Sequence, residues 1–418
     1  MAARVEAALG EHSPWAADLC AALMGRPLGL WALLTVPRLA QQLRREPAFV
    51  AAFESDWPPV LRCPVLTPER MRPAPLGLDH CAVPVLTGFG EVAAWLGLDT
   101  PDLEPYVACP PRQRRADLAW QHYRWRWWPK PAGGVRLLEV PRPRLKALQR
   151  RVLDDLLDRL PVHEAACGFV RGRGLMDHAT LHAGQAVLLH FDLRDFFGSV
   201  PAARVHAVFA TLGYPPGVCR VLTALLTSRV PEPVLQRLRD EGLIDWPQAQ
   251  RLRDAHLPQG APTSPALANL CAFGLDLRLD GLAHVLGARY SRYADDLLLS
   301  GPPALRARAA AIEGRVGAIV REEGFRLNHR KTHVGTQAGA QRVCGVVVNQ
   351  QPNLPRRDFD RLKALLHRCT VHGPAAQNTA GAPDFRAHVM GQVGWAAQVN
   401  PAKAVRLQAL LARIDWGR

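Results

Sequence analysis

Two adjacent aspartates, Asp295 and Asp296, stand between two runs that have the length of strands, Arg289-Tyr-Ser-Arg292 before them and the apolar Leu297-Leu-Leu-Ser300 after them. The runs predict strands at about 288–294 and 297–301, so that the pair lies at the tip of a hairpin. Tight hairpin turns favour Asn-Gly or Asp-Gly, and neighbouring carboxylates repel each other unless a cation neutralises them. Turn chemistry therefore explains the pair poorly, and the pattern indicates metal binding.

A third carboxylate, Asp192, ends another apolar run, which predicts a buried strand at 187–191. Three carboxylates gathered by one sheet suit two Mg²⁺ ions about 3.5–4 Å apart, the arrangement used for in-line phosphoryl transfer. A helix N-cap is the alternative for Asp192 alone, and the Asp295–Asp296 pair makes that alternative the weaker one. Asp195, close by in the chain, is predicted to form a structural hydrogen bond.

Three motifs in order resemble the palm of reverse transcriptases. They are Phe191-Asp-Leu-Arg-Asp-Phe-Phe197, Gln259-Gly-Ala-Pro-Thr-Ser-Pro265 followed by Leu267-Ala-Asn269, and Tyr293-Ala-Asp-Asp296. The resemblance extends to a fingers hairpin at 130–136 and a loop at 324–331, and it covers the chain from about residue 120 onward. It implies an RNA-directed DNA polymerase in which Asp192, Asp295 and Asp296 are catalytic and hold two Mg²⁺ ions.

The same resemblance assigns residues to the incoming dNTP. Phe197 would stack under the sugar and exclude a 2′-hydroxyl, with a core aromatic as the alternative. Gln259 and Gly260 would line the nucleotide pocket, where glycine allows close backbone approach. Arg136 can clamp a phosphate through two hydrogen bonds, and Lys331 would protonate pyrophosphate unless it is a solvated surface lysine. The predicted dNTP site comprises Lys130, Arg136, Leu193, Phe197, Gln259, Gly260 and Lys331.

Aromatic and cationic residues alternate in Tyr123-Arg-Trp-Arg-Trp127, which predicts the first strand of a hairpin whose second strand is 135–140. The period of two places an aromatic face against the protein and a basic face opposite it. The basic face suits phosphate contacts and base stacking, and a merely solvated face is the alternative. The predicted nucleic-acid-binding residues are Arg124, Arg126 and Trp128, together with Arg171 and Arg173 of Gly168-Phe-Val-Arg-Gly-Arg173.

Further motifs resemble those of bacterial retron enzymes. His178-Ala-Thr-Leu-His182 resembles an N-A-x-x-H signature with His in place of Asn, and Val343-Cys-Gly345 resembles V-T-G. His182 is predicted to be structural. The retron resemblance implies a structured non-coding RNA as template and primer, priming from an RNA 2′-hydroxyl, a branched RNA–DNA product, phage defence, and an effector or toxin protein as a further partner.

Two alternatives to a retron enzyme stay open. One is another bacterial reverse transcriptase, defence-associated or intron-derived, with a different template. The other is a non-catalytic RNA-binding scaffold that retains the polymerase fold. The intact set of three aspartates argues against a scaffold, because converging negative charges near phosphates have no use there.

Charge is distributed unevenly along the 418 residues, which carry a formal net charge of +15. Residues 1–109 hold 8 basic and 12 acidic side chains, residues 110–151 hold 12 basic and 2 acidic ones, and residues 354–418 hold 10 basic and 4 acidic ones. Basic patches favour a polyanionic partner, here an RNA–DNA hybrid gripped from two sides. Genome bias toward arginine explains the Arg-to-Lys ratio but not the excess.

Nine cysteines without a C-x-x-C pair or zinc-finger spacing predict neither a disulfide framework nor structural zinc. The most apolar early stretch, 20–36, is interrupted by Arg26 and Pro27 and is too short to cross a bilayer. These features predict a cytoplasmic protein with no membrane partner.

The whole pattern predicts an α+β right-hand polymerase. Its parts are a helical N-terminal extension at 1–110, fingers and palm at 111–350 with an antiparallel sheet plus helices, and a short helical thumb at 351–418. A single strand is predicted at 341–349. Thumb helices are predicted near 355–371, 384–397 and 401–415.

Overall fold

The computed structural model describes residues 5–6, 13–24, 40–41, 43–55, 58–59, 70–75, 77–107, 122–129 and 135–417. Lys130 and the turn predicted at 131–134 lie outside these residues. The chain divides into two compact units, Met1–Glu69 and Arg70–Arg418. The predicted boundaries at residues 110 and 350 stay predictions.

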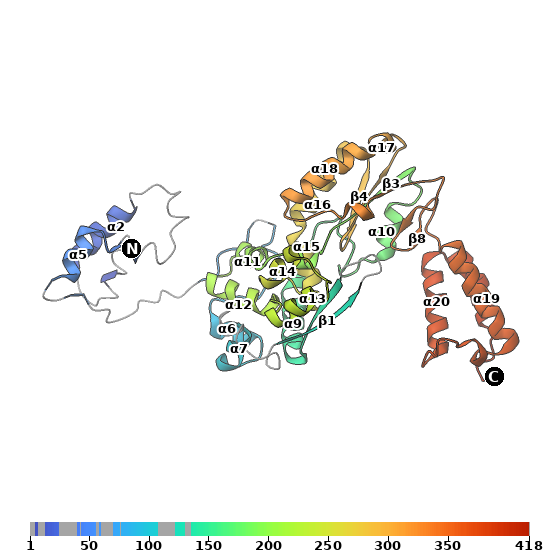
Figure 1. The fold of residues 1–418 in the computed structure, drawn as a ribbon, viewed down its shortest axis with the longest axis horizontal. Helices are drawn as coiled ribbons and strands as arrows, with labels where there is room; N and C mark the ends of the chain where they lie inside the picture. Colours follow the sequence, from blue (N-terminus) through green and yellow to red (C-terminus); the bar gives the residue numbers. More distant parts are fainter. Residues whose placement is uncertain are drawn as a thin grey trace. The chain divides into compact units, whose positions relative to one another are not determined.

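The first unit contains helices α2 (Pro14–Met24) and α5 (Pro47–Phe53), drawn in blue in Figure 1. They pack through aromatic side chains, since the Trp15 ring centroid lies 6.2 Å from the centroid of Phe49 and 6.2 Å from that of Phe53. Edge-to-face aromatic pairs of this kind stabilise by about 0.5–1.5 kcal/mol beyond the area they bury.

A four-stranded antiparallel sheet, with strand order β4–β5–β3–β6, lies at the centre of the second unit. Its strands are β3 (Val187–Asp192), β4 (Arg289–Tyr293), β5 (Asp296–Gly301) and β6 (His333–Thr336). The predicted strands before Asp192 and around the aspartate pair are confirmed. The sequence does not predict β6, because four residues with a central glycine carry no alternating apolar pattern.

The two faces of the sheet pack against different clusters, because successive strand residues point to opposite sides. Leu189 and Phe191 belong to the main core, whereas Leu188 and Leu298 join a smaller cluster with helix α10 (Leu175–Leu181). Main-core residues come from α9 (Pro143–Asp155), α11 (Ala202–Thr211), α12 (Pro216–Leu226), α15 (Ser264–Cys271), α16 (Phe273–Val285), α17 (Ala304–Ala307) and α18 (Ala309–Glu322).

Helices α6 (Phe89–Trp95) and α7 (Thr100–Val107) also belong to the second unit. Val92 and Leu103 are fully buried in the main core. Each fully buried aliphatic side chain contributes about 1.5–3 kcal/mol, so these two short helices are firmly packed into the main core of the second unit.

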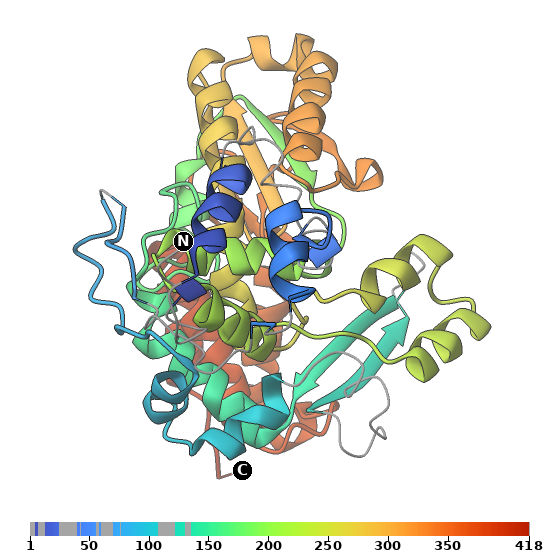
Figure 2. The same cartoon turned by 90° about the vertical axis from the view of Figure 1, so that its left-hand side faces the viewer.

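A hairpin of β1 (Tyr123–Pro129) and β2 (Val135–Pro141) forms the fingers strands, as predicted. It runs beside α13 (Glu232–Asp240) and α14 (Trp246–Arg253), as Figure 2 shows. Trp125 and Trp127 pack on the apolar cluster of these helices, whereas Trp128 is half exposed. The predicted division into an aromatic face and a basic face is therefore confirmed for this hairpin.

The single strand predicted at 341–349 is wrong. The segment forms a minimal hairpin of β7 (Arg342–Val343) and β8 (Val346–Val347), because the chain reverses at Cys344 and Gly345, both of which have a positive φ. The glycine adopts this conformation at no steric cost, whereas Cys344 adopts it against its preference. Apolar residues alone do not reveal such a reversal.

The C-terminal helices α19 (Arg356–His372), α20 (Phe385–Val399) and α21 (Pro401–Leu411) have a core of their own and match the predicted helices closely. Asp384 and Asn400 begin α20 and α21 by accepting hydrogen bonds from the backbone N–H groups of Ala387 and Lys403. No helix among the described residues is long and apolar enough to cross a membrane.

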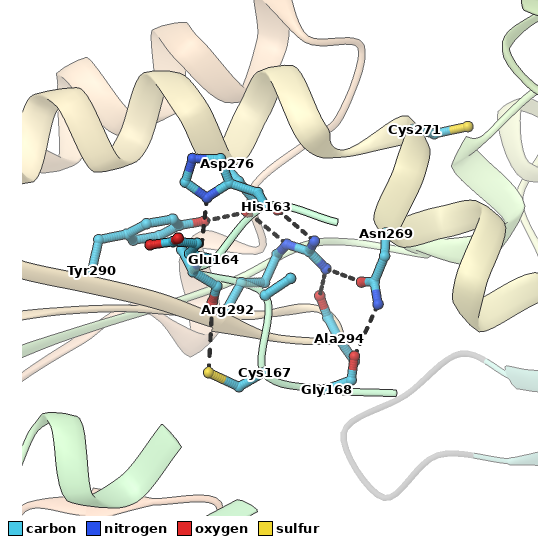
Figure 3. Close-up of polar contacts among 12 residues, drawn as sticks. His163, Glu164, Cys167, Gly168, Asn269, Cys271, Asp276, Tyr290, Arg292 and Ala294 are labelled. Atoms are coloured by element: carbon cyan, nitrogen blue, oxygen red, sulfur yellow. Dashed lines mark hydrogen bonds and ion pairs between the residues drawn. The ribbon is translucent and has the colours of Figure 1, made fainter. Parts of the chain in front are cut away.

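A buried ion pair between Arg292 and Asp276 stabilises the turn between β4 and β5 (Figure 3). Neither side chain of the pair is exposed to solvent. The guanidinium donates to both carboxylate oxygens, Nε to Oδ1 at 2.8 Å and Nη2 to Oδ2 at 2.6 Å. Its Nη1 donates to the Asn269 side-chain oxygen at 2.9 Å and to the Ala294 carbonyl at 3.1 Å. Tyr290 adds a hydroxyl bond to Asp276 at 2.9 Å.

We predict that Arg292→Met destabilises the protein by about 3–5 kcal/mol, because it leaves the Asp276 carboxylate buried without a cation. Chemical denaturation of the purified protein measures this loss. The double variant Arg292→Met with Asp276→Leu should recover much of it, since apolar groups of similar volume often replace a buried pair without cost. A single variant with the wild-type denaturation midpoint would contradict the prediction.

Candidate active site

The three predicted aspartates meet at one edge of the palm sheet. Asp192, the last residue of β3, is paired in register with Asp296, the first residue of β5. Asp295 precedes it in the turn, where Ala294 has a φ of +57°, and the Asp295 carbonyl accepts a hydrogen bond of 2.8 Å from the Leu193 N–H. The backbone register therefore places Asp192 beside Asp296, whereas the metal-binding role of the three carboxylates stays a prediction.

Burial and neighbouring charges shift the pKa values of two residues at this edge, Asp295 and Lys331. Burial, and then the neighbouring carboxylates of Asp296 and Asp192, raise the pKa of Asp295 above its usual value. Lys331 places its Nζ 2.7 Å from Asp192 Oδ2, and this hydrogen bond raises the pKa of the lysine. Lys331 is therefore bound to one of the three predicted catalytic aspartates, which argues against a merely solvated lysine.

Two further side chains contact the aspartates and are absent from the predicted site. His190 Nε2 lies 2.9 Å from Asp296 Oδ1, and Asn328 Nδ2 donates to Asp192 Oδ1 at 3.1 Å. A signal for His190 exists in the sequence, since it stands two residues before Asp192 and so shares its face of the strand. The sequence signal for Asn328 is weaker, and consists only of its place in the loop at 324–331.

Among the residues that the structure describes, no group of three or more His, Cys, Asp or Glu side chains is gathered closely enough to hold a metal ion by itself. Lysine, histidine and asparagine partners occupy the carboxylate oxygens instead. Mg²⁺ usually binds one or two carboxylates and completes its shell with water and substrate phosphates, rather than in an all-protein cage. Carboxylate oxygens are the hard ligands that suit Mg²⁺. Asp192 is buried and both of its oxygens accept hydrogen bonds from Asn328 and Lys331, so Asp192 would exchange these bonds to hold the ion, whereas Asp295 and Asp296 are partly exposed.

The loop that begins with Gln259 is held against the fingers hairpin. The Glu139 N–H donates to the Gln259 carbonyl at 2.8 Å. Gly260 has a φ of +133°, and a Cβ there would lie 2.9 Å from the Glu139 carbonyl oxygen, so a larger residue does not fit. Buried His256 lies 2.8 Å from Glu139; burial alone would lower the pKa of His256, but the carboxylate outweighs it and raises that pKa.

Two predicted dNTP residues differ in their placement. Phe197 is partly exposed beside buried Phe196, which fits a nucleotide-facing role for Phe197 and a core role for Phe196. Leu193 is only 1% exposed and its side chain belongs to the main core, while its assignment to the dNTP site stays a prediction. The sequence alone does not distinguish a leucine that faces the core from one that faces the site when it directly follows a strand.

Residues 128–353 match the family described as reverse transcriptase (RNA-dependent DNA polymerase). The retron Mx65 reverse transcriptase of Myxococcus xanthus is 41% identical over 332 residues, which cover 79% of this chain and 72% of that protein. This chain belongs to the reverse transcriptases of bacterial retrons. It is an RNA-directed DNA polymerase with the α+β fold of that family.

Other relatives agree. The retron Mx162 enzyme of Myxococcus xanthus is 34% identical, with 72% of this chain and 62% of that protein covered. The retron Ec86 enzyme of Escherichia coli is 29% identical, with 68% and 78% covered. Among solved structures, telomerase from Candida albicans covers 72% of this chain and 58% of its own at 11% identity and a TM-score of 0.39, and we draw no argument from it.

The retron-like histidines are structural in this reverse transcriptase, as predicted for His182. This side chain is buried and shares hydrogen bonds of 2.7 Å with the hydroxyls of Ser300 and Ser291. Burial lowers the pKa of His182 to about 3, so the ring is neutral. It joins α10 to strands β4 and β5 from beneath the catalytic edge.

Several non-glycine residues near the three aspartates in the chain or in space have a left-handed backbone conformation. The non-glycine residues of positive φ among those described are Phe169, Asp195, Ala294 and Cys344. Asp195 accepts hydrogen bonds from Gln248 and Arg251, which confirms its structural role. Burial, and then the nearby charges of Asp296 and Asp295, raise the pKa of the Cys344 thiol to about 12.

The predicted nucleic-acid residues fall into two groups. Arg124, Arg126 and Trp128 are exposed on β1, and Arg136 is exposed opposite Trp128 on β2. Arg171 is also exposed. Arg173 is exposed as well, but its Nη1 donates to the carbonyls of Glu164 at 2.7 Å and Ala166 at 3.0 Å, so its guanidinium also holds a turn of the protein.

We predict that Arg124→Gln with Arg126→Gln weakens RNA binding and makes the slope of log K against log salt shallower by about 1.5–2, because two phosphate contacts are lost. Filter binding across a salt series measures the slope. Arg306→Gln with Arg308→Gln is the matched control, because these exposed arginines follow the end of β5 that is far from the aspartates. An unchanged slope in the first variant would identify a solvated face.

Proposed function

We propose that the edge formed by Asp192, Asp295 and Asp296 is the catalytic centre of this reverse transcriptase and that it holds two Mg²⁺ ions. The observation that carries the proposal is the register pairing of Asp192 with Asp296, with Asp295 in the adjoining turn. Bound Mg²⁺ would activate a primer hydroxyl and stabilise the departing pyrophosphate.

The chain's own residues prepare this edge. Lys331 and His190 stand against Asp192 and Asp296 and reduce the repulsion between carboxylates. We assign Lys331 the further role of proton donor to the pyrophosphate, since its ammonium is at the edge and partly exposed. Arg292 and His182 lie beneath the edge and orient it without touching substrate.

The nucleotide pocket lies between this edge and the fingers in our proposal. Phe197 would exclude the ribose 2′-hydroxyl, and Gln259 and Gly260 would line the base and sugar through a loop that Glu139 fixes. Arg136 would bind the triphosphate, together with Lys130.

We further propose that the template and primer are a structured non-coding RNA, that synthesis starts from an RNA 2′-hydroxyl, and that the product is a branched RNA–DNA. The support is the identity to proteins named retron reverse transcriptases. Phage defence, an effector or toxin partner and a cytoplasmic location belong to the same proposal. The basic face of β1 and the basic C-terminal helices would hold the RNA–DNA hybrid.

We predict that Asp295→Asn with Asp296→Asn lowers the rate of primer extension by about three orders of magnitude, because metal coordination provides several kcal/mol of transition-state stabilisation. Extension of a DNA primer on an RNA template measures this. Asp154→Asn with Asp155→Asn, another adjacent pair but on the surface of α9, is the control. RNA binding should persist in both, and retained extension in the first variant would refute the site.

We predict that the purified protein carries a short DNA of defined sequence joined to RNA. Sequencing the nucleic acid that copurifies, with and without RNase treatment, identifies the template and tests the branch. A heterogeneous RNA with no linked DNA would favour a reverse transcriptase with another kind of template.

A further inference from the structure

Phe169 combines two unusual features. Its side chain is 54% exposed, although it is a large aromatic group, and its φ is +60°. Non-glycine residues in the left-handed region are uncommon, and such strain persists only where the surroundings impose it, often at functional sites. Glycine would remove the strain, so the aromatic ring requires an explanation of its own.

Contacts of the two preceding residues, Cys167 and Gly168, impose this backbone conformation on Phe169. The Cys167 N–H donates to the Arg292 carbonyl at 2.8 Å. Asn269 Nδ2 donates to the Gly168 carbonyl at 2.9 Å (Figure 3). A Cβ on Gly168 would lie 2.8 Å from the Ala294 backbone nitrogen, so the backbone segments at Gly168 and Ala294 are in direct contact. The Arg292 network therefore fixes the segment before Phe169 directly onto the turn that carries Asp295.

Held in this way, Phe169 joins two aromatic residues of the catalytic edge. Its ring centroid lies 6.4 Å from that of Phe197 and 6.1 Å from that of Tyr293. Tyr293 immediately precedes the turn of Asp295, and Phe197 follows Asp192. We call Phe169, Phe197 and Tyr293 the aromatic shelf. Because Phe169 is more than half exposed, much of its ring is free to contact a ligand.

We propose that Phe169 stacks on a base of the terminal template–primer base pair and positions that pair for reaction. The inference rests on the proposed function of the neighbouring aspartates. Every base offers a π face, so an aromatic side chain suits an enzyme that must accept all four base pairs in turn. Charged side chains dominate phosphate contacts, whereas an apolar ring beside the reacting groups is suited to a base.

Steady-state extension of a DNA primer on an RNA template tests the proposal. Phe169→Ala should lower kcat/KM by about 5- to 150-fold, the range found when base–aromatic stacking is removed. Phe169→Trp should retain most of the activity, whereas Phe169→Leu, apolar but not aromatic, should not. Phe169→Gly should be as inactive as the alanine variant while its Tm is equal to or above that of the wild type, because the backbone strain is relieved.

A primer that ends in 2-aminopurine reports stacking without catalysis. Its fluorescence should fall when wild-type protein binds and fall less with Phe169→Ala, measured without dNTP. Phe273→Ala is the matched control, because Phe273 is 41% exposed and contacts the His163 ring rather than the shelf. Discrimination against ribonucleotides should change in Phe197→Ala and stay unchanged in Phe169→Ala, which separates stacking from sugar selection.

The outcomes distinguish this inference from the proposed catalytic centre. Wild-type kcat/KM in Phe169→Ala, or an unaltered 2-aminopurine signal, would overturn the role of Phe169 while leaving the aspartates untouched. If the Asp295→Asn with Asp296→Asn variant still extended primers, the catalytic assignment would fail, and the fluorescence signal would still decide whether Phe169 stacks.

Discussion

The ion pair of Arg292 with Asp276 is the interaction on which the catalytic edge depends. Both groups are fully buried, and burying two charges is costly unless their geometry is good and their remaining hydrogen-bonding atoms are satisfied. Here the guanidinium is shared among Asp276 of α16, Asn269 of α15 and the Ala294 carbonyl. One cation thereby connects two helices to the turn that carries the aspartate pair.

The carboxylates of Asp192, Asp295 and Asp296 repel one another, and the protein offsets this repulsion only in part. Asp295 has a raised pKa beside two other carboxylates, while Lys331 and His190 stand against Asp192 and Asp296. Such an edge suits cations that arrive with phosphate-bearing substrates, since no preformed cage has to be dismantled. In our proposal the basic face of the fingers hairpin would attract the polyanion without adding cations to the edge itself.

Local patterns explain which parts of the site could be predicted. Asp192 follows an apolar run and Asp296 precedes another, and both the length of each run and its end can be read along the chain. The fingers hairpin could be predicted for the same reason, since alternation of period two requires only neighbouring residues. Edge strand β6 and the reversal at Cys344 could not, because a four-residue strand is stabilised by its partner and a left-handed turn by its surroundings.

The sequence by itself determined the family, the three carboxylates and the alternation of the fingers strand, because each depends on residue type and spacing. Only the tertiary structure decided that Lys331 contacts Asp192 across 139 positions, that Leu193 turns into the core, and that Arg173 binds carbonyls instead of standing free. It also decided that Phe169 stands exposed beside Phe197. The physical reason is that burial, pairing and strain are properties of surroundings assembled from distant segments, which no local pattern contains.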